Sequence, residues 1–512
     1  MTELYGNDGA TGGGDAAEAA NPRPNGAPVE GDGRPVSVSA RLGRLQFHHS
    51  GKFRVLQFAD IQDGPKVSKD TIRLIETSLD AARPDIVVFS GNQIAGYDPA
   101  FAATFRKRRW RDEQEAAGAQ SPRIGSGDRL SESGSASKRR AAELEKTRKL
   151  ARKAVGQFLA PLIKRGVPFA VTYGNHDFQC GLDVDEFDAI YREFPGCLNA
   201  APIDAGDAPG AVSGAGDAGD AGTGGEGLAA DSADPFDPSE PRSCTMPLSG
   251  LADQQVFPCE PGTLALPVMD VERTRNVLAL VLVNSGDYAR EGGYGSPSGA
   301  ALRFLASIPA RIGTQSLVFQ HMPLPQYYEL LTPAEPNAPG AMQGYRAYAS
   351  AYYVMDESKM QPGSYLGEGI SCPDADCGEY DVLRGRGEAG KGESGKADAQ
   401  HGERGYFGIV AGHDHRNGFV GELDGMMMVA TPTCGFGSYG PAPEKRAARL
   451  FEFDIRHPHN PRTQLLEFGD LVGKPSSRKA YSYDIADVKA ESEGMNLLHK
   501  KNLWDSLRGL FA

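Results

Sequence analysis

Residues 53–64 read FRVLQFADIQDG and residues 85–98 read DIVVFSGNQIAGYD. Each stretch begins with a short apolar run, which is typical of a buried strand. Between them, the apolar side chains of residues 71–82 fall on one helical face, and Pro84 ends the helix. A strand, a helix and a second strand in so short a span predict a parallel α/β unit.

The same pattern recurs along the chain. Further buried strands are predicted at 169–173, 276–283, 315–320, 408–411, 426–430 and 448–454, with a helix at 146–159. Five of the buried strands stop at a Gly, Asp or His, and polar residues follow directly. In open α/β sheets, binding sites assemble at the carboxyl ends of the strands.

Composition excludes several classes of protein. The 512 residues include 54 Lys and Arg against 67 Asp and Glu, which gives a formal net charge of −13. Nucleic-acid binders need a basic face, so we expect no nucleic-acid binding. The N-terminus does not resemble a signal peptide, and the longest apolar run, residues 277–283, is too short to span a bilayer. We therefore expect a cytoplasmic protein with no transmembrane segment, in which the seven cysteines are reduced.

Stretches rich in Gly, Ala, Ser and charge divide the chain. The expected organisation is a disordered tail over 1–37, one catalytic domain over 38–475 with low-complexity insertions at about 111–143, 200–240 and 384–404, and a polar tail over 476–512. The last tail ends in an amphipathic helix at 496–511. We expect this helix to dock on the domain, and the alternative is binding to a partner or a membrane surface.

Metal-ligand residue types cluster at the predicted strand ends. In chain order they are Asp60-Ile61-Gln62, Gly91-Asn92-Gln93, Gly174-Asn175-His176-Asp177, His321 and Gly412-His413-Asp414-His415. A lone histidine is more often structural than a ligand. However, four of the ten histidines lie in these segments, and all four follow predicted buried strands. Together they predict a metal site at the sheet edge.

This series resembles the calcineurin-like metallophosphoesterase superfamily, whose motifs run DxH, GD, GNH(D/E), H and GHxH. The blocks GNHD at 174–177, HMPLP at 321–325 and AGHDH at 411–415 are similar to the stand-alone branch called purple-acid-phosphatase-like. The resemblance extends from about residue 54 to about residue 454. It implies an α/β fold, a four-layer αββα sandwich with mixed sheets and a two-metal site along one edge.

The resemblance also implies a role for each matching residue. The first metal would be held by Asp60, Gln62, Asn92 and His415, and the second by Asn92 as the bridge, Asn175, His321 and His413. His176 would stabilise the transition state or protonate the leaving oxygen, with Asp177 orienting its ring. The implied cofactors are one or two divalent metal ions, with Mn, Fe, Zn and Mg all compatible.

Two positions depart from the family pattern. Gln62 stands where a histidine is expected, and Asn92 stands where the bridging aspartate is expected. Both changes weaken the first metal site, because an amide is a weaker ligand than an imidazole or a carboxylate. Tyr97 is not a clear replacement, and Asp63 or Asp98 could move in.

Two functions therefore stay open. The first is a metal-dependent phosphoesterase, a hydrolase acting on phosphoric ester bonds of a small molecule or a phosphoprotein. The alternative is a weakened or inactive pseudo-phosphatase that serves as a phosphate-binding or scaffolding module. The intact His176-Asp177 pair and GHDH motif favour the enzyme, whereas the missing bridging carboxylate favours the alternative.

Overall fold

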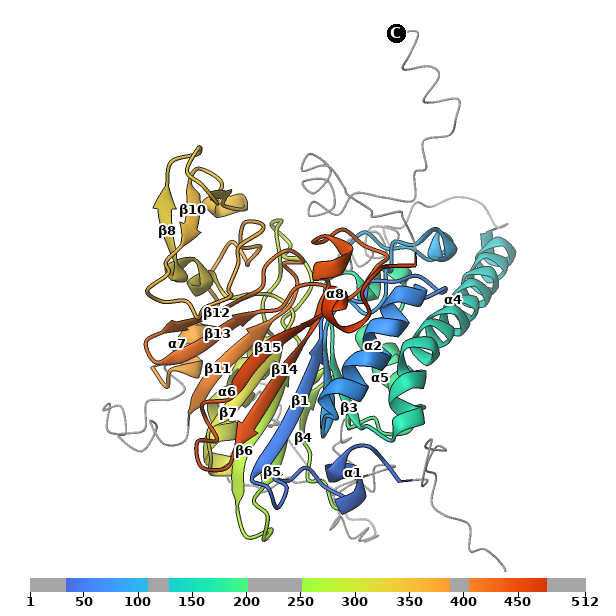
Figure 1. The fold of residues 1–512 in the computed structure, drawn as a ribbon. Helices are drawn as coiled ribbons and strands as arrows, with labels where there is room; N and C mark the ends of the chain where they lie inside the picture. Colours follow the sequence, from blue (N-terminus) through green and yellow to red (C-terminus); the bar gives the residue numbers. More distant parts are fainter. Residues whose placement is uncertain (1–33, 109–128, 201–250, 387–404, 477–512) are drawn as a thin grey trace, which may run out of the picture.

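Two β-sheets lie face to face at the centre of the fold (Figure 1). The computed structural model describes residues 34–108, 129–200, 251–386 and 405–476. The five-stranded sheet has the order β15-β14-β1-β2-β3. Its strands are β1 (Lys52–Phe58), β2 (Ile86–Ser90), β3 (Phe169–Thr172), β14 (Ala447–Asp454) and β15 (Arg462–Glu467).

The second sheet has seven strands in the order β12-β13-β11-β7-β6-β5-β4. Its strands are β4 (Phe257–Glu260), β5 (Thr263–Met269), β6 (Asn276–Val283), β7 (Ser316–Gln320), β11 (Tyr406–Ala411), β12 (Phe419–Leu423) and β13 (Met426–Ala430). In the seven-stranded sheet the central strands β13, β11, β7 and β6 are parallel and the outer pairs are antiparallel. In the five-stranded sheet β1, β2 and β3 are parallel, and β14 and β15 pair antiparallel, so both sheets are mixed.

Helices cover the outer face of each sheet. On the five-stranded sheet these are α2 (Lys69–Ala82), α4 (Arg129–Arg165) and α5 (Val184–Arg192), and on the seven-stranded sheet α6 (Gly299–Ile312), α7 (Glu379–Leu383) and the 3-10 turn η3 (Pro325–Leu330). A separate apolar cluster, which includes Val55 and Phe319, fills the space between the sheets. The fold is thus the predicted four-layer αββα sandwich.

Shorter elements complete the described chain. They are α1 (Val38–Leu42), α8 (Phe468–Leu471), the 3-10 turns η1 (Pro99–Phe101), η2 (Asp177–Cys180), η4 (Arg346–Tyr348) and η7 (Pro443–Lys445), and a small sheet of β8 (Leu331–Ala334), β9 (Met342–Gln343) and β10 (Tyr352–Met355). None of the described helices has the length and apolar character needed to cross a bilayer.

The predicted strands at 276–283 and 426–430 match β6 and β13 residue for residue. Helix α4 differs from its prediction, because it begins at Arg129, inside the stretch expected to be an insertion. The run of Ala, Glu, Lys and Arg before residue 146 favours helix, so the helical segment continues through what low complexity suggested was a loop. The C-terminal helix predicted at 496–511 lies outside the described residues.

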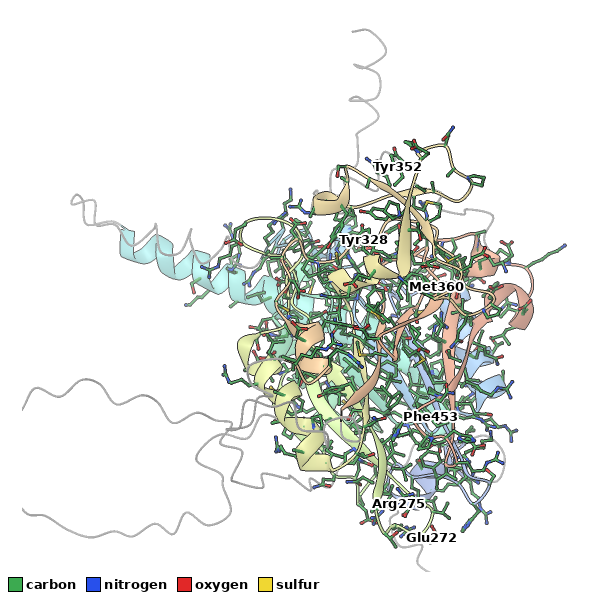
Figure 2. All side chains as sticks on the ribbon, turned by 90° about the vertical axis from the view of Figure 1, so that its left-hand side faces the viewer. Glu272, Arg275, Tyr328, Tyr352, Met360 and Phe453 are labelled. Carbon is green, nitrogen blue, oxygen red and sulfur yellow. The ribbon has the colours of Figure 1, made fainter. Side chains whose placement is uncertain are left out.

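The carboxyl ends of the parallel strands share one end of the sandwich. Glu272 and Arg275, in the turn that precedes β6, mark the opposite end, whereas Tyr328 and Tyr352 lie at the end that β6 runs toward (Figure 2). Because all the predicted donor residues follow the carboxyl ends of strands in the two sheets, this topology brings them together.

Candidate metal centre

The strand ends of both sheets converge on one group of polar side chains. The five-stranded sheet supplies Asp60 and Gln62 after β1, Asn92 after β2, and Asn175 and His176 after β3, while the seven-stranded sheet supplies His321 after β7 and His413 and His415 after β11. Each of these side chains is more than nine-tenths buried. Most of them form two groups, a histidine half (Asn175, His321 and His413) and an aspartate half (Asp60, Gln62 and His415).

Four of these residues have left-handed backbone conformations. The φ angles are 54° at Asp60, 43° at Gln62, 53° at Asn92 and 67° at His413. Such a conformation costs of order 1–3 kcal/mol for a residue other than glycine, and it persists only where the surroundings hold it. Backbone strain concentrated at one group of polar residues is typical of a functional site.

Glycines next to the donors allow close packing. A Cβ atom on Gly174 would lie 2.4 Å from Asn92 Oδ1, and one on Gly91 would lie 2.5 Å from His321 Nδ1. Both distances are shorter than any tolerated contact. The glycines of the GN and GNHD motifs are therefore required by the packing of the donors themselves.

In the histidine half, two lone pairs face each other. His321 Nδ1 lies 3.0 Å from the Ser90 carbonyl, which can only accept, so Nδ1 carries the ring proton. Burial lowers the pKa of His321, which keeps the ring neutral and leaves Nε2 with a lone pair. This Nε2 lies 3.1 Å from Asn175 Oδ1, another acceptor. Neither of these two atoms carries a proton for the other.

His413 completes this half. Its Nδ1 lies 3.2 Å from His321 Nε2, and its ring packs edge-on against Tyr294 with 4.3 Å between ring centres. Its Nε2 is buried and has no hydrogen-bond partner among the described residues. Burial lowers the pKa of His413 well below the usual value, so this ring is also neutral.

The aspartate half pairs a carboxylate with an imidazole. Asp60 Oδ1 lies 3.2 Å from His415 Nε2, and Asp60 Oδ2 accepts the His413 backbone N–H at 2.9 Å. Burial works against the ionised carboxylate, but His415 and His321 outweigh it and hold the pKa of Asp60 at about 2. For His415, burial works against the charged ring, but Asp60 outweighs it and raises the pKa.

Gln62 presents its amide oxygen. The Gln62 amino group donates to the Tyr97 hydroxyl at 2.9 Å, and Gln62 Oε1 is buried with no partner in the described part of the chain. The Tyr97 ring also packs edge-on against His176, with 4.9 Å between ring centres. Tyr97 therefore connects a donor of the centre to the proposed catalytic histidine.

Asn92 presents its amide nitrogen. The His176 backbone N–H donates to Asn92 Oδ1 at 2.8 Å, which turns the Asn92 amino group toward the centre. That amino group donates to Asp60 Oδ1 at 3.2 Å and to Asn175 Oδ1 at 3.1 Å. Asn92 thus joins the two halves by hydrogen bonds.

The role expected for Asp177 is wrong. Its carboxylate does not orient His176. Instead, it accepts the backbone N–H groups of Asn92, Gly174 and Ile94 at 2.8, 2.9 and 2.9 Å. His176 Nδ1 lies 2.7 Å from Gln179 Oε1, which orients the ring. Asp177 ties the loops after β2 and β3 together.

Neither predicted substitute carboxylate contacts the donors. Asp63 accepts the Ser68 N–H and the Thr71 hydroxyl at 3.0 and 2.8 Å, and Asp98 caps Ala100 at 2.8 Å. Both are used to hold the loops after β1 and β2 in place.

Several contacts of the centre were missed at the sequence level. Glu368 accepts the Arg416 N–H at 2.9 Å and contributes to the raised pKa of His415. The Tyr439 carbonyl lies 2.7 Å from His415 Nδ1. The Tyr288 hydroxyl accepts the Asn175 amino group at 2.8 Å. Tyr288 and Tyr439 had a sequence signal, since Tyr288 follows a strand in LVNSGDY and Tyr439 lies in GFGSYG, whereas Glu368 had none.

Two donor spacings in the histidine half are compatible with one shared divalent cation when Nδ1 is the unprotonated nitrogen of His413. Ligand atoms about 2.0–2.1 Å from the same cation stand about 3.0–3.4 Å apart, and the spacings of 3.1 and 3.2 Å here agree with this. Within the described ranges, no three His, Cys, Asp or Glu side chains form a metal site by themselves. The histidine half reaches three donors only through the amide oxygen of Asn175.

Two tyrosines lie between the metal-centre donors and a neighbouring cleft of about 840 Å³. Tyr288 and Tyr294 line it, and they also contact Asn175 and His413 respectively. No donor of the centre lines this cleft, and its wall includes the carboxylates of Asp185, Glu260 and Asp287. It is therefore a neighbouring feature and not the centre itself.

No protein-family model and no curated protein matches the chain. Among solved structures, the chain is similar to a dimetal phosphatase from Danio rerio at 10% identity and a TM-score of 0.33, covering 81% of this chain and 99% of that one. It is similar to the protein TT1561 of Thermus thermophilus at 7% identity and a TM-score of 0.30, covering 81% and 98%. The corresponding values for PhoD are 9%, 0.36, 91% and 79%.

Proposed function

We propose that the protein is a metal-dependent phosphoester hydrolase with a centre of the calcineurin-like metallophosphoesterase type. The observation that carries this proposal is the convergence of lone pairs in the histidine half. Asn175 Oδ1 and His321 Nε2 lie 3.1 Å apart with no proton between them, an arrangement that a cation relieves. The motif resemblance supplies the reaction class. Neither the fold alone nor the distant structural likenesses could do so.

A divalent cation bound there would supply electrostatic stabilisation of a phosphoryl group and activation of water. The chain's own residues would hold and orient the phosphoryl group beside His176. Burial lowers the pKa of His176 to about 4, so the ring is neutral at pH 7, and Gln179 fixes the Nδ1 proton. An adjacent phosphate dianion would raise that pKa again, so that Nε2 could carry a proton to the leaving oxygen.

The second candidate is a pseudo-phosphatase that binds phosphate without hydrolysing it. The orientation of Asn92 favours it, because the amino group lies where the family resemblance places an anionic bridge. The two candidates share the same fold and the same donors. They differ only in whether the phosphoryl group is turned over.

Turnover of p-nitrophenyl phosphate and bis-p-nitrophenyl phosphate by the full chain loaded with Mn²⁺ separates them. For the enzyme we expect metal-dependent turnover that falls by about 10²–10⁴-fold in His176→Ala, with metal content unchanged. His49→Ala, at an exposed loop position, is the matched control and should keep full turnover. Metal binding without turnover of either ester would instead support the phosphate-binding module.

A further inference from the structure

Asn92 sets the number of cations that the centre can hold. We propose that the protein binds one divalent cation, in the histidine half, and that the Asn92 amino group clamps Asp60 to Asn175 in place of a bridging ligand. This inference rests on the proposed metal-dependent function. It also departs from the two-metal arrangement that the family resemblance implies.

The orientation of the Asn92 amide is fixed by its partners. A backbone N–H can only donate, so the group 2.8 Å from His176 N must be the amide oxygen. The reversed amide would place oxygen against Asp60 Oδ1 and Asn175 Oδ1, two acceptors, and would set the amino group against the His176 N–H. Three contacts therefore select the same orientation.

An amide nitrogen cannot bridge two cations. Its lone pair is delocalised into the carbonyl, and its two hydrogens carry partial positive charge. Both hydrogens point at the atoms that would ligate the two metals, Asp60 Oδ1 and Asn175 Oδ1. The position that should carry a negative charge between two cations therefore presents a positive one.

The two halves respond differently to this clamp. Asn175 Oδ1 has two lone pairs, so it can accept from Asn92 and still face a cation with the other. His321 and His413 add two imidazoles, and three neutral ligands are sufficient in known catalytic zinc sites. In the aspartate half, both oxygens of the one carboxylate already accept N–H groups, Oδ1 from the Asn92 amino group and Oδ2 from the His413 backbone, and Gln62 adds only an amide oxygen. On that ground we assign the single cation to the histidine half.

Metal stoichiometry of the full chain tests the proposal without an activity assay. The wild-type chain and Asn92→Asp would each be dialysed against Mn²⁺ and examined for Mn²⁺ per chain and by electron paramagnetic resonance. We expect one Mn²⁺ per wild-type chain, with the hyperfine pattern of an isolated ion. We expect a second Mn²⁺ in Asn92→Asp, spin-coupled to the first, because a carboxylate there restores an anionic bridge.

Asn276→Asp is the matched control. It makes the same chemical change at the start of β6, the end of that strand away from the centre, and should bind Mn²⁺ as wild type does. Asn92→Ala covers the case in which Asn92→Asp does not fold. It should still bind one isolated Mn²⁺, because the donors of the histidine half remain.

The outcomes separate this proposal from the proposed function. Two coupled ions in the wild-type chain would overturn the single-cation proposal and leave the hydrolase intact. A single ion in a folded Asn92→Asp would overturn the role given to the Asn92 amino group. No Mn²⁺ in any variant would overturn the proposed function as well.

Discussion

The loops that follow β2 and β3 each place one asparagine side chain at the centre, and the two side-chain amides face the centre with opposite ends. Asn92, after β2, directs its amino group inward because the His176 N–H holds its oxygen. Asn175, after β3, directs its oxygen inward because the Tyr288 hydroxyl accepts its amino group. One amide acts as a hydrogen-bond donor and the other as a ligand. The partner behind each amide, and not the residue type, decides which.

The same contrast divides the whole centre. The histidine half contains neutral acceptors with no proton to share between His321 and Asn175. The aspartate half contains a carboxylate that already has an imidazole and an amide N–H as neighbours. We therefore expect substitutions in the histidine half to change cation binding strongly, and substitutions in the aspartate half to change it little.

Truncating each asparagine in turn should give the largest difference. Asn175→Ala removes an oxygen ligand from the histidine half, and we expect Mn²⁺ affinity to fall on the order of 100-fold or more. Asn92→Ala removes the clamp and the acceptor of the His176 N–H but no ligand of the cation, and we expect a change of no more than about three-fold. Isothermal titration of the full chain with Mn²⁺ measures both.

Circular dichroism should accompany these titrations, because both loops also donate backbone hydrogen bonds to Asp177. Equal losses of affinity in the two folded variants would contradict the distinction between ligand and clamp. A larger loss in Asn92→Ala would reverse it.

Much of this site could be predicted from the sequence, for a physical reason. Apolar runs such as residues 276–283 mark buried strands, and polar residues directly after them must lie at a sheet edge. The bounds of β6 and the positions of His321 and His413 follow from this rule. The start of α4 did not, because low complexity alone does not distinguish a charged, solvated helix from a loop.

The orientation of the side chains could not be predicted. Nothing in the sequence indicates that the His176 backbone N–H turns Asn92, or that Gln179 and not Asp177 orients the His176 ring. These contacts depend on left-handed φ angles and on loops from different parts of the chain. Glu368 lies in a loop with no motif, so its place beside His415 comes from tertiary packing alone.

Removing the hydroxyl behind Asn175 tests the comparison more finely. Tyr288→Phe takes away the acceptor of the Asn175 amino group, and an amino group left without a partner at a buried site favours rotation of the amide. We expect Mn²⁺ affinity to fall by about 10-fold, which is the scale of lost support behind a ligand. Titration of the purified variant with Mn²⁺ gives the value.

Tyr353→Phe is the control for that change. It removes a hydroxyl from β10, in the small sheet, outside the hydrogen bonds that orient the two asparagines. If Tyr288→Phe binds Mn²⁺ as tightly as Tyr353→Phe does, the hydroxyl does not set the orientation of Asn175. In that case the Asn92 amino group alone must hold it.

The pH dependence of cation binding should show the smallest effect, and it identifies the half that binds. Protons compete with a cation for an imidazole only near or below the pKa of that imidazole. Burial lowers the pKa of His321 and His413, and the neighbouring rings of His415 and His176 lower that of His413 further, although Asp60 opposes them. Binding in the histidine half should therefore weaken by less than about three-fold when Mn²⁺ titrations are moved from pH 8 to pH 6.

His415 differs, because Asp60 outweighs burial and raises its pKa. A cation that used His415 would therefore lose affinity by up to about 10-fold per pH unit below that pKa. A steep fall over this range would place the cation in the aspartate half, and the contrast between the two asparagines would then no longer explain where the protein binds its metal.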